Sequence, residues 1–237
     1  MTFTEVNQHP VVREAEFKRL LGVPADFAFT PLLAENAAWA RAWYAAHGRP
    51  WLWARPAGSC AVTGEVVTLD AQDLTSRELA RRFRAADRAV VVAASAGAEA
   101  EAEAARCWEN DEPDRYFFME TYASAVVEAL IAEAGARLCS WADGLGAVLL
   151  PHYSPGYPGW SVGEQARVFS LLTATGEPPG PLEVMASGML RPKKSQLAVF
   201  ALAPAGSAGA APADLVPCHA CALRHCAFRR AASAVAP

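Results

Sequence analysis

Nine consecutive residues, His152-Tyr153-Ser154-Pro155-Gly156-Tyr157-Pro158-Gly159-Trp160, form the most distinctive segment of the chain. Two prolines and two glycines in this short stretch fix the backbone at some positions and let it approach a ligand closely at others. We therefore predict a loop of defined shape. The apolar segment 147–150 predicts a strand before it. Ser161 and Glu164 form a capping-box pattern, which predicts a helix from there through Leu172.

Apolar periodicity outside this loop predicts a mixture of helices and strands. Helices are expected over 11–22, 31–47, 75–84, 98–107 and 116–139. Strands are expected over 61–69, 89–94, 182–189 and 196–202. The alternating Ala and Glu of 98–107 favour an exposed helix, whereas the broad apolar stripe of 116–139 favours a central, buried one.

The composition excludes some classes of partner. The chain has 237 residues, 53% of them hydrophobic, which suffices for one large core. A formal net charge of −4, without a block of Lys and Arg beside aromatic residues, argues against nucleic acid. Residues 1–30 lack the apolar region of a signal peptide, and no apolar run is long enough to predict a membrane span. We expect a cytoplasmic protein that binds neither nucleic acid nor membrane.

Several segments resemble the S-adenosylmethionine-binding activation domain of cobalamin-dependent methionine synthase. Gly156, Tyr157 and Pro158 match the Gly-Tyr-Pro turn of that family. The loop and the residues that follow it are closer still to small stand-alone members associated with corrinoid methyl transfer, at 154–157, 159–160 and 164–165. Weaker matches occur in the same order along the chain, at 20–24, 90–97, 125–129 and 189–195. The resemblance spans residues 11–203.

The resemblance implies a fold and a role. The family's fold is α+β, with a strongly curved antiparallel sheet flanked by helices and a shallow groove for the cofactor. Its role is reductive reactivation, in which an electron and the methyl group of S-adenosylmethionine together restore methylcobalamin from cob(II)alamin. This chain has no Asp-x-His-x-x-Gly segment for holding a corrinoid. The implied partners are therefore a cobalamin-binding methyltransferase or corrinoid protein, which carries the cobalamin, and an electron-donor protein.

S-adenosylmethionine presents an ammonium, a carboxylate and an adenine ring, which need an acceptor, hydrogen-bond donors and an apolar or aromatic wall. Glu128, the loop, and Tyr157 or Trp160 are the respective candidates. The complete set of candidate cofactor contacts is Glu128, His152, Ser154, Pro155, Gly156, Tyr157, Pro158, Trp160 and Ser195. A solvated Glu128 and simple core packing of both aromatic residues are the alternative interpretations. No protein nucleophile is required, since the sulfonium supplies the methyl group.

One position departs from the family pattern. Five residues before Tyr157 the family usually has arginine, and this chain has His152. Arginine is a permanent bidentate donor to a carboxylate, whereas histidine with an ordinary pKa near 6.5 is mostly neutral at pH 7. We expect the contact with the cofactor's carboxylate to be weaker by about 1–2 kcal/mol.

The C-terminal end differs chemically from the rest. Residues 204–217 are rich in Ala, Gly and Pro, which predicts a flexible tether between a domain over 1–203 and a tail over 218–237. The tail carries potential metal ligands at Cys218, His219, Cys221, His225 and Cys226. The C-x2-C spacing favours zinc or an iron–sulfur cluster, completed by a histidine or by one of Cys60, Cys107 and Cys139. Free or redox-active thiols are the alternative.

These observations leave three hypotheses for function. The first is a module that binds S-adenosylmethionine and reactivates a separate cobalamin protein. The second is a related groove that serves another methyl transfer or another ligand, as His152 in place of arginine permits. The third is a metal-binding scaffold protein without enzymatic activity. Loss of ligand binding on replacement of Tyr157 and Glu128 by alanine separates the first two hypotheses from the third.

Overall fold

The computed structural model describes residues 1–206. Its main sheet has five strands in the order β1-β2-β6-β10-β7, and all neighbouring strands are antiparallel. In that order the strands are Phe3–Val6, Trp51–Pro56, Arg88–Ser95, Ser195–Pro204 and Ala147–Tyr153. A smaller antiparallel sheet contains β3, β4 and β5, which are Cys60–Thr63, Val66–Leu69 and Gln72–Thr75. The two-residue strands β8 and β9 pair as Glu183–Val184 and Leu190–Arg191.

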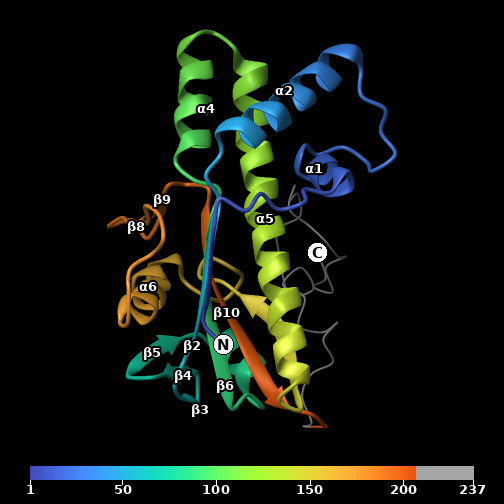
Figure 1. The fold of residues 1–237 in the computed structure, drawn as a ribbon. Coiled ribbons are helices and arrows are strands. Elements are labelled where there is room, and N and C mark those ends of the chain that lie inside the picture. The colour runs from blue at the N-terminus through green and yellow to red at the C-terminus, as the bar shows by residue number, and fades with distance from the viewer. Residues whose placement is uncertain (207–237) are drawn as a thin grey trace, which may run out of the picture.

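Helices pack on both faces of the main sheet. One face is covered by α1, α2, α4 and α5, which are Glu14–Leu20, Pro31–His47, Glu99–Glu109 and Pro113–Asp143. The other face carries the small sheet with α3 and α6, which are Arg77–Phe83 and Gln165–Thr173. A short 3-10 helix, η1 (Val162–Glu164), precedes α6. Figure 1 shows α5 as a long helix lying against the main sheet, with α4 beside its first half.

The two central strands separate two hydrophobic cores. Along β6, Val92 faces the core under α5, whereas its neighbour Val91 faces the core under α3 and α6. Along β10, Phe200 faces the core under α5, whereas its neighbour Val199 faces the core under α3 and α6. Strands buried on both faces have near-continuous apolar sequences, which explains why both were predicted from their composition. Each fully buried Val or Leu side chain contributes about 1.5–3 kcal/mol.

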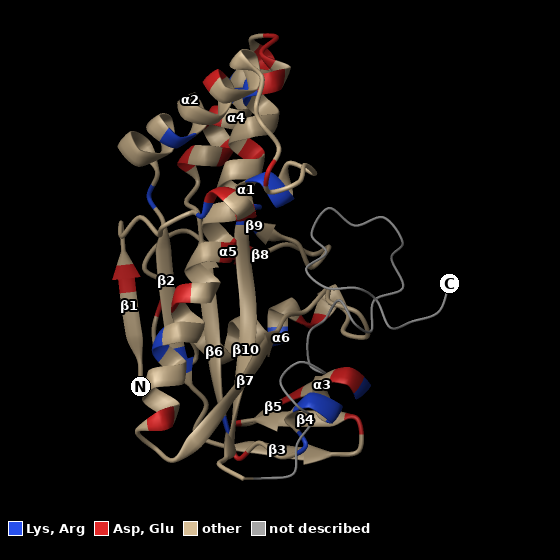
Figure 2. Cartoon of the chain, turned by 90° about the vertical axis from the view of Figure 1, so that its right-hand side faces the viewer, with Lys and Arg blue, Asp and Glu red and all other residues tan. Residues whose placement is uncertain are grey.

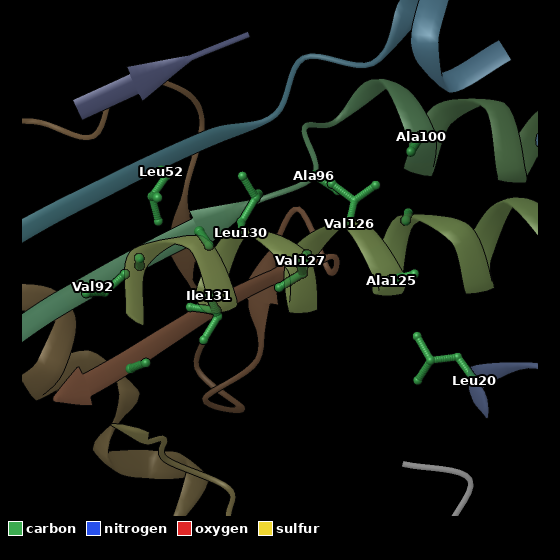
Figure 3. Packing of buried hydrophobic residues seen from close by; sticks show 14 of the residues in the cluster. Leu20, Leu52, Val92, Ala96, Ala100, Ala125, Val126, Val127, Leu130 and Ile131 are labelled. Carbon is green, nitrogen blue, oxygen red and sulfur yellow. The ribbon is translucent and has the colours of Figure 1, made fainter. Parts of the chain in front are cut away.

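Helix α5 is the main element of the first core. It begins at Pro113, a residue whose fixed φ suits the first helical position. Figure 3 shows Leu130 of α5 between that helix and the strand that carries Val92. A Cβ at Gly135 would lie 3.5 Å from the ring of Phe200, so this glycine lets the helix approach β10 closely. The central helix predicted over 116–139 is present, and it is longer than predicted because it runs from Pro113 to Asp143.

Some predicted elements were wrong in extent. The single strand expected over 61–69 is the hairpin β3–β4, because the chain turns at Gly64, whose φ is +61°. The strand expected over 182–189 is limited to β8. Strands β1, β2 and β5 were not predicted, because they are short or contain polar residues and prolines that give no clear alternation.

Two predictions about side chains were also wrong. The expected capping box does not form: the Ser161 hydroxyl accepts a bond from the Gly163 amide, while the Glu164 carboxylate accepts one from the Thr75 amide. The helix expected to be exposed, α4, buries one face, because Cys107 is fully covered and Glu103 is only 9% exposed. An Ala-rich stripe is enough to pack this helix against α5.

Charged residues concentrate on the helices and loops. In Figure 2 the strands β6, β10 and β7 are almost entirely free of charged positions, as expected for strands between two cores. Within residues 1–206, no helix combines the length and the apolar character needed to cross a membrane.

Candidate functional site

A cavity of about 380 Å³ lies between α5 and the edge strand β7. Glu128 on α5 and His152 near the end of β7 both line it. Its remaining walls are mainly apolar and come from α5, β7 and Phe200 of β10. The sequence singled out both Glu128 and His152, which are 24 positions apart, and the fold brings them to one cavity.

His152 belongs to the strand and not to the loop that follows it. It is the residue before Tyr153, the last residue of β7, so the main sheet fixes its backbone. The imidazole lies beside the ring of Phe200, with 5.4 Å between ring centroids. Its Nε2 atom lies 3.3 Å from the Tyr157 hydroxyl. The side chain is therefore held between the cavity wall and the loop.

A hydrogen-bond network joins the loop to the start of β10. The Gln196 side-chain amide donates to the Ser154 hydroxyl over 2.9 Å and to the Tyr157 hydroxyl over 3.2 Å. Tyr157 also contacts His152. Together these contacts join four polar side chains into one network beside the cavity, namely His152, Tyr157, Gln196 and Ser154. Ser154 is only 2% exposed, so its hydroxyl would lose hydrogen bonds to water on folding. The bond from Gln196 replaces them and removes the free-energy cost of an unsatisfied buried hydroxyl. This network sets the position of the Tyr157 hydroxyl.

The loop itself is a compact turn stabilised by backbone hydrogen bonds. The Tyr157 amide donates to the Ser154 carbonyl over 3.0 Å, and the Gly156 amide donates to the Trp160 carbonyl over 2.9 Å. Gly156 has a φ of +91°, a backbone conformation that residues with a Cβ atom rarely adopt. The predicted loop of defined shape is present, and glycine is required at this position.

A second set of contacts supports the loop from the other face of the sheet. The Tyr153 ring stacks on Trp160, and the guanidinium of Arg82 lies 4.2 Å from the centre of the Tyr153 ring. The Tyr153 hydroxyl donates to the Pro158 carbonyl. Burial raises the pKa of Tyr153 to about 12, so the hydroxyl stays protonated as a donor at neutral pH. Ser76 adds a bond of 2.8 Å to the Gly159 carbonyl.

The remaining predicted contacts occupy different places. Trp160 is 2% exposed and lies in the core below the loop, so its ring has no face open to an adenine. This placement favours the alternative interpretation of core packing for Trp160. Ser195 donates to the Ser95 hydroxyl over 2.9 Å, on the neighbouring strand. Pro155 is buried and Tyr157 is half-buried at the edge of the same core.

Gln196 was not selected from the sequence, and Cys139 was considered there only as an additional metal ligand. Gln196 contacts both the serine and the tyrosine of the loop, and Cys139 lines the cavity as an exposed thiol. A signal for Gln196 was present, because it is the one polar side chain within the apolar stretch 196–203. No pattern distinguished Cys139 from an ordinary helix residue.

The basic turn before β10 pairs with α5. Glu120 contacts Lys193 over 2.8 Å and Lys194 over 3.1 Å, and Lys194 also donates to the Ser124 hydroxyl over 3.0 Å. Burial opposes the charge of Lys193, but the bond to Glu120 keeps the pKa of this lysine above its usual value. The turn therefore anchors the start of β10, where Gln196 begins the polar network.

The predicted metal ligands Cys218, His219, Cys221, His225 and Cys226 lie outside the described residues. Within residues 1–206, no group of three or more His, Cys, Asp or Glu side chains is placed to hold a metal ion. Of the cysteines proposed as an additional ligand, Cys107 is buried and Cys60 is half-buried. Burial raises the pKa of Cys60 to about 11, which disfavours its thiolate. Cys139 is exposed.

Comparison with known proteins gives a structural match. No protein-family model matches the chain, and the search of curated proteins finds no match either. Among solved structures, the crystal structure of the MetH reactivation domain bound to AdoHcy matches over 90% of this chain and 81% of that chain. The TM-score is 0.62 and the sequence identity is 14%. The likeness shows a shared fold. An α+β domain with an antiparallel sheet and flanking helices is thus confirmed.

Proposed function

We propose that this chain binds S-adenosylmethionine in the cavity between α5 and β7. The observation that carries the proposal is the convergence of Glu128 and His152 on one cavity, with Tyr157 in contact with His152. The shared fold supports it, because the neighbouring structure is that of a reactivation domain bound to AdoHcy. The carboxylate of Glu128 is an acceptor for the ligand's ammonium, and the His152 and Tyr157 side chains are partners for its carboxylate.

The cavity suits a ligand of this kind. Its volume of about 380 Å³ lies within the usual range of roughly 300–1,000 Å³ for small-molecule pockets. The apolar wall formed by Ile131, Leu149 and Phe200 offers a surface for the adenosyl group. The polar side chains that line the cavity are few, which suits a ligand that is largely apolar with one zwitterionic end.

The role we propose is to support reductive methylation of cob(II)alamin on a separate corrinoid or methionine synthase protein. When bound, S-adenosylmethionine supplies an electrophilic methyl group on its sulfonium. This chain's residues bind and orient that ligand, so its own contribution is positioning. The reduction also needs an electron from a donor protein. We further propose that the tail cysteines hold zinc or an iron–sulfur cluster, as their spacing suggests.

The binding proposal is tested by calorimetric titration of the full chain, purified anaerobically, with S-adenosylmethionine and with S-adenosylhomocysteine. Glu128→Gln keeps the size of the side chain but removes its charge, and we expect at least about tenfold weaker binding, or ~1.4 kcal/mol. Glu109→Gln, at the exposed end of α4, is the matched control and leaves affinity unchanged. Absence of binding in the wild-type chain contradicts the proposal.

A second candidate function follows from His152 itself. Histidine in place of a permanent cation makes the cavity less selective for a carboxylate, so a different S-adenosyl compound or another ligand is an alternative occupant. The two functions differ in their dependence on cobalamin. The first function is supported if a cobalamin protein is methylated only when this chain, a reductant and S-adenosylmethionine are all present. The second is supported if the chain binds a ligand but no such methylation occurs.

A further inference from the structure

The two edges of the main sheet differ in how they are guarded against further pairing. Its outer strands are β1 and β7. Strand β1 has only four residues and carries Glu5, whose buried side chain pairs with Arg137 of α5. Short strands and charged side chains are common ways of keeping an edge strand from pairing with another chain. Strand β7 is longer, with seven residues, and it has no charged residue (Figure 2).

The edge formed by β7 is apolar and lies in a long uncharged stretch. Residues 144–163 contain no Asp, Glu, Lys or Arg. The side chains of Leu145 and Val148 are each 42% exposed. Within residues 1–206, β10 is the one strand that pairs with β7. Pro151 lacks an amide hydrogen, so pairing with a further strand is confined to residues 147–150.

Helix α5 extends this uncharged surface beyond the strand. Ala132, Ala136 and Cys139 are exposed and lie on one side of the helix, because they are spaced by four and three positions. All three line the cavity that Leu149 of β7 also lines, so this stripe of the helix lies beside the edge of the sheet. The strand edge and the helix stripe therefore form one continuous surface.

A second copy of the chain fits this surface by symmetry. A two-fold axis perpendicular to the sheet pairs β7 antiparallel with its own copy and places both copies of α5 on the same face. Helix α5 packs on β7 and on β10 behind it, so its axis lies inside the edge. Two strand spacings of about 4.8 Å then separate the two helices by about 10 Å. Packed helices usually lie roughly 8–10 Å apart, and the small side chains of the stripe allow this approach.

The lack of charge also favours a second copy over a charged partner. An uncharged edge offers a charged protein no opposite charge to pair with, whereas a copy brings an equally uncharged strand and stripe. We propose that this chain forms a two-fold symmetric dimer in which the β7 strands pair over residues 147–150 and the α5 helices pack along Ala132, Ala136 and Cys139. Because the cavity lies between these two elements, the second copy forms a wall of it.

Sedimentation velocity of the full chain over a wide range of concentration tests the proposal, and we expect a dimer that dissociates on dilution. Val148→Lys should raise the dissociation constant at least about tenfold, because a lysine on the edge opposes pairing. Ala136→Glu should act in the same direction, since it brings two carboxylates together at the contact between the helices. Val6→Lys is the matched control, because Val6 is 49% exposed on the other edge strand, and it leaves the constant unchanged.

Chemical cross-linking gives a second measurement of the same contact. Cys139 lies beside β7, so its two copies come close together in the dimer. A short bismaleimide should join them, and peptide mass spectrometry identifies which cysteines are linked. We expect this link in the wild-type chain and in Val6→Lys, and its loss in Val148→Lys. The buried Cys107 should stay unlinked in all three proteins, which checks that each is folded.

The proposed dimer does not depend on the function proposed above, because the edge and the stripe exist without a ligand. A chain that sediments as a monomer at every concentration overturns the proposal. So does a dimer whose dissociation constant is the same in the wild type, Val148→Lys and Ala136→Glu, because such a dimer uses another surface. Both outcomes are decided whether or not S-adenosylmethionine binds.

Discussion

The Nε2 atom of His152 lies 3.3 Å from the hydroxyl of Tyr157, so a polar contact between side chains joins the end of β7 to the loop that follows it. The sheet fixes the histidine and the turn fixes the tyrosine, and Gln196 links the two elements through the Tyr157 hydroxyl. The distance between these two side chains therefore depends on how β7, β10 and the loop pack together. A ligand's carboxylate at this position would meet a preorganised pair of partners.

Replacement of His152 by arginine tests whether a carboxylate binds here. Arginine offers a permanent charge and two parallel donors, so His152→Arg should bind S-adenosylmethionine more tightly by about 1.4 kcal/mol, or roughly tenfold. Titration calorimetry of the two proteins measures the difference. The matched control is His47→Arg, because His47 lies at the end of α2, away from the cavity. Equal affinity of wild type and His152→Arg places the carboxylate elsewhere.

Gln196 is expected to hold the loop in place. Gln196→Met keeps the length of the side chain and removes its donors, which leaves the buried Ser154 hydroxyl without that partner. We expect a loss of about 1–2 kcal/mol in the free energy of unfolding and weaker ligand binding. Urea denaturation and calorimetry measure the two effects. Gln8→Met, at an exposed position, should change stability by less than about 0.5 kcal/mol.

The sequence predicted the central elements well, for a physical reason. The long helix and the strands β6 and β10 are surrounded by core, so their apolar patterns are strong. The strands β1 and β2 were missed because they are short or contain polar residues and a proline, which give no clear alternation. At the site, Glu128 and His152 were chosen by motif, whereas Gln196 and Cys139 join the site only through tertiary packing. For Trp160 the sequence left ligand contact and core packing both open, because an aromatic residue beside a turn suits a ligand and a core equally well; its burial favours the second.

Arg82 is expected to stabilise the fold much more than its neighbour Arg81. Both pair with Glu78, but the Arg82 side chain is 1% exposed and stacks on Tyr153, whereas the Arg81 side chain is 38% exposed. Removing one partner of a buried ion pair costs about 3 kcal/mol or more, and an exposed pair contributes at most about 1 kcal/mol. Arg82→Met and Arg81→Met, compared by urea denaturation, should differ accordingly. Similar losses in both variants would show that the Arg82 stack adds nothing.

Glu78 should make stability depend on acid pH. Burial alone would raise the pKa of Glu78, but bonds from Arg81 and the charge of Arg82 together hold it below its usual value. A carboxyl whose pKa is lowered by folding stabilises the fold above its unfolded pKa of about 4.3, and this contribution disappears as pH falls through the folded pKa. The wild type should therefore be more stable than Glu78→Gln at pH 7, with the gap closing in acid. A gap that stays constant from pH 7 to acid argues against this linkage.

Two glycines allow backbone strain to be separated from steric overlap. Gly156 and Gly97 have φ of +91° and +88°, so an added Cβ is strained at both. At Gly156 the nearest atom to that Cβ is 3.9 Å away, whereas at Gly97 the backbone carbonyl of Arg49 is only 2.8 Å away. Gly156→Ala should therefore cost about 1–3 kcal/mol from strain alone, and Gly97→Ala should cost more. Gly163→Ala is the control, because it has no positive φ and its nearest contact is 3.5 Å. If Gly156→Ala is as stable as the wild type but binds ligand weakly, the loop has changed shape without loss of fold, and its conformation then matters for binding more than for stability.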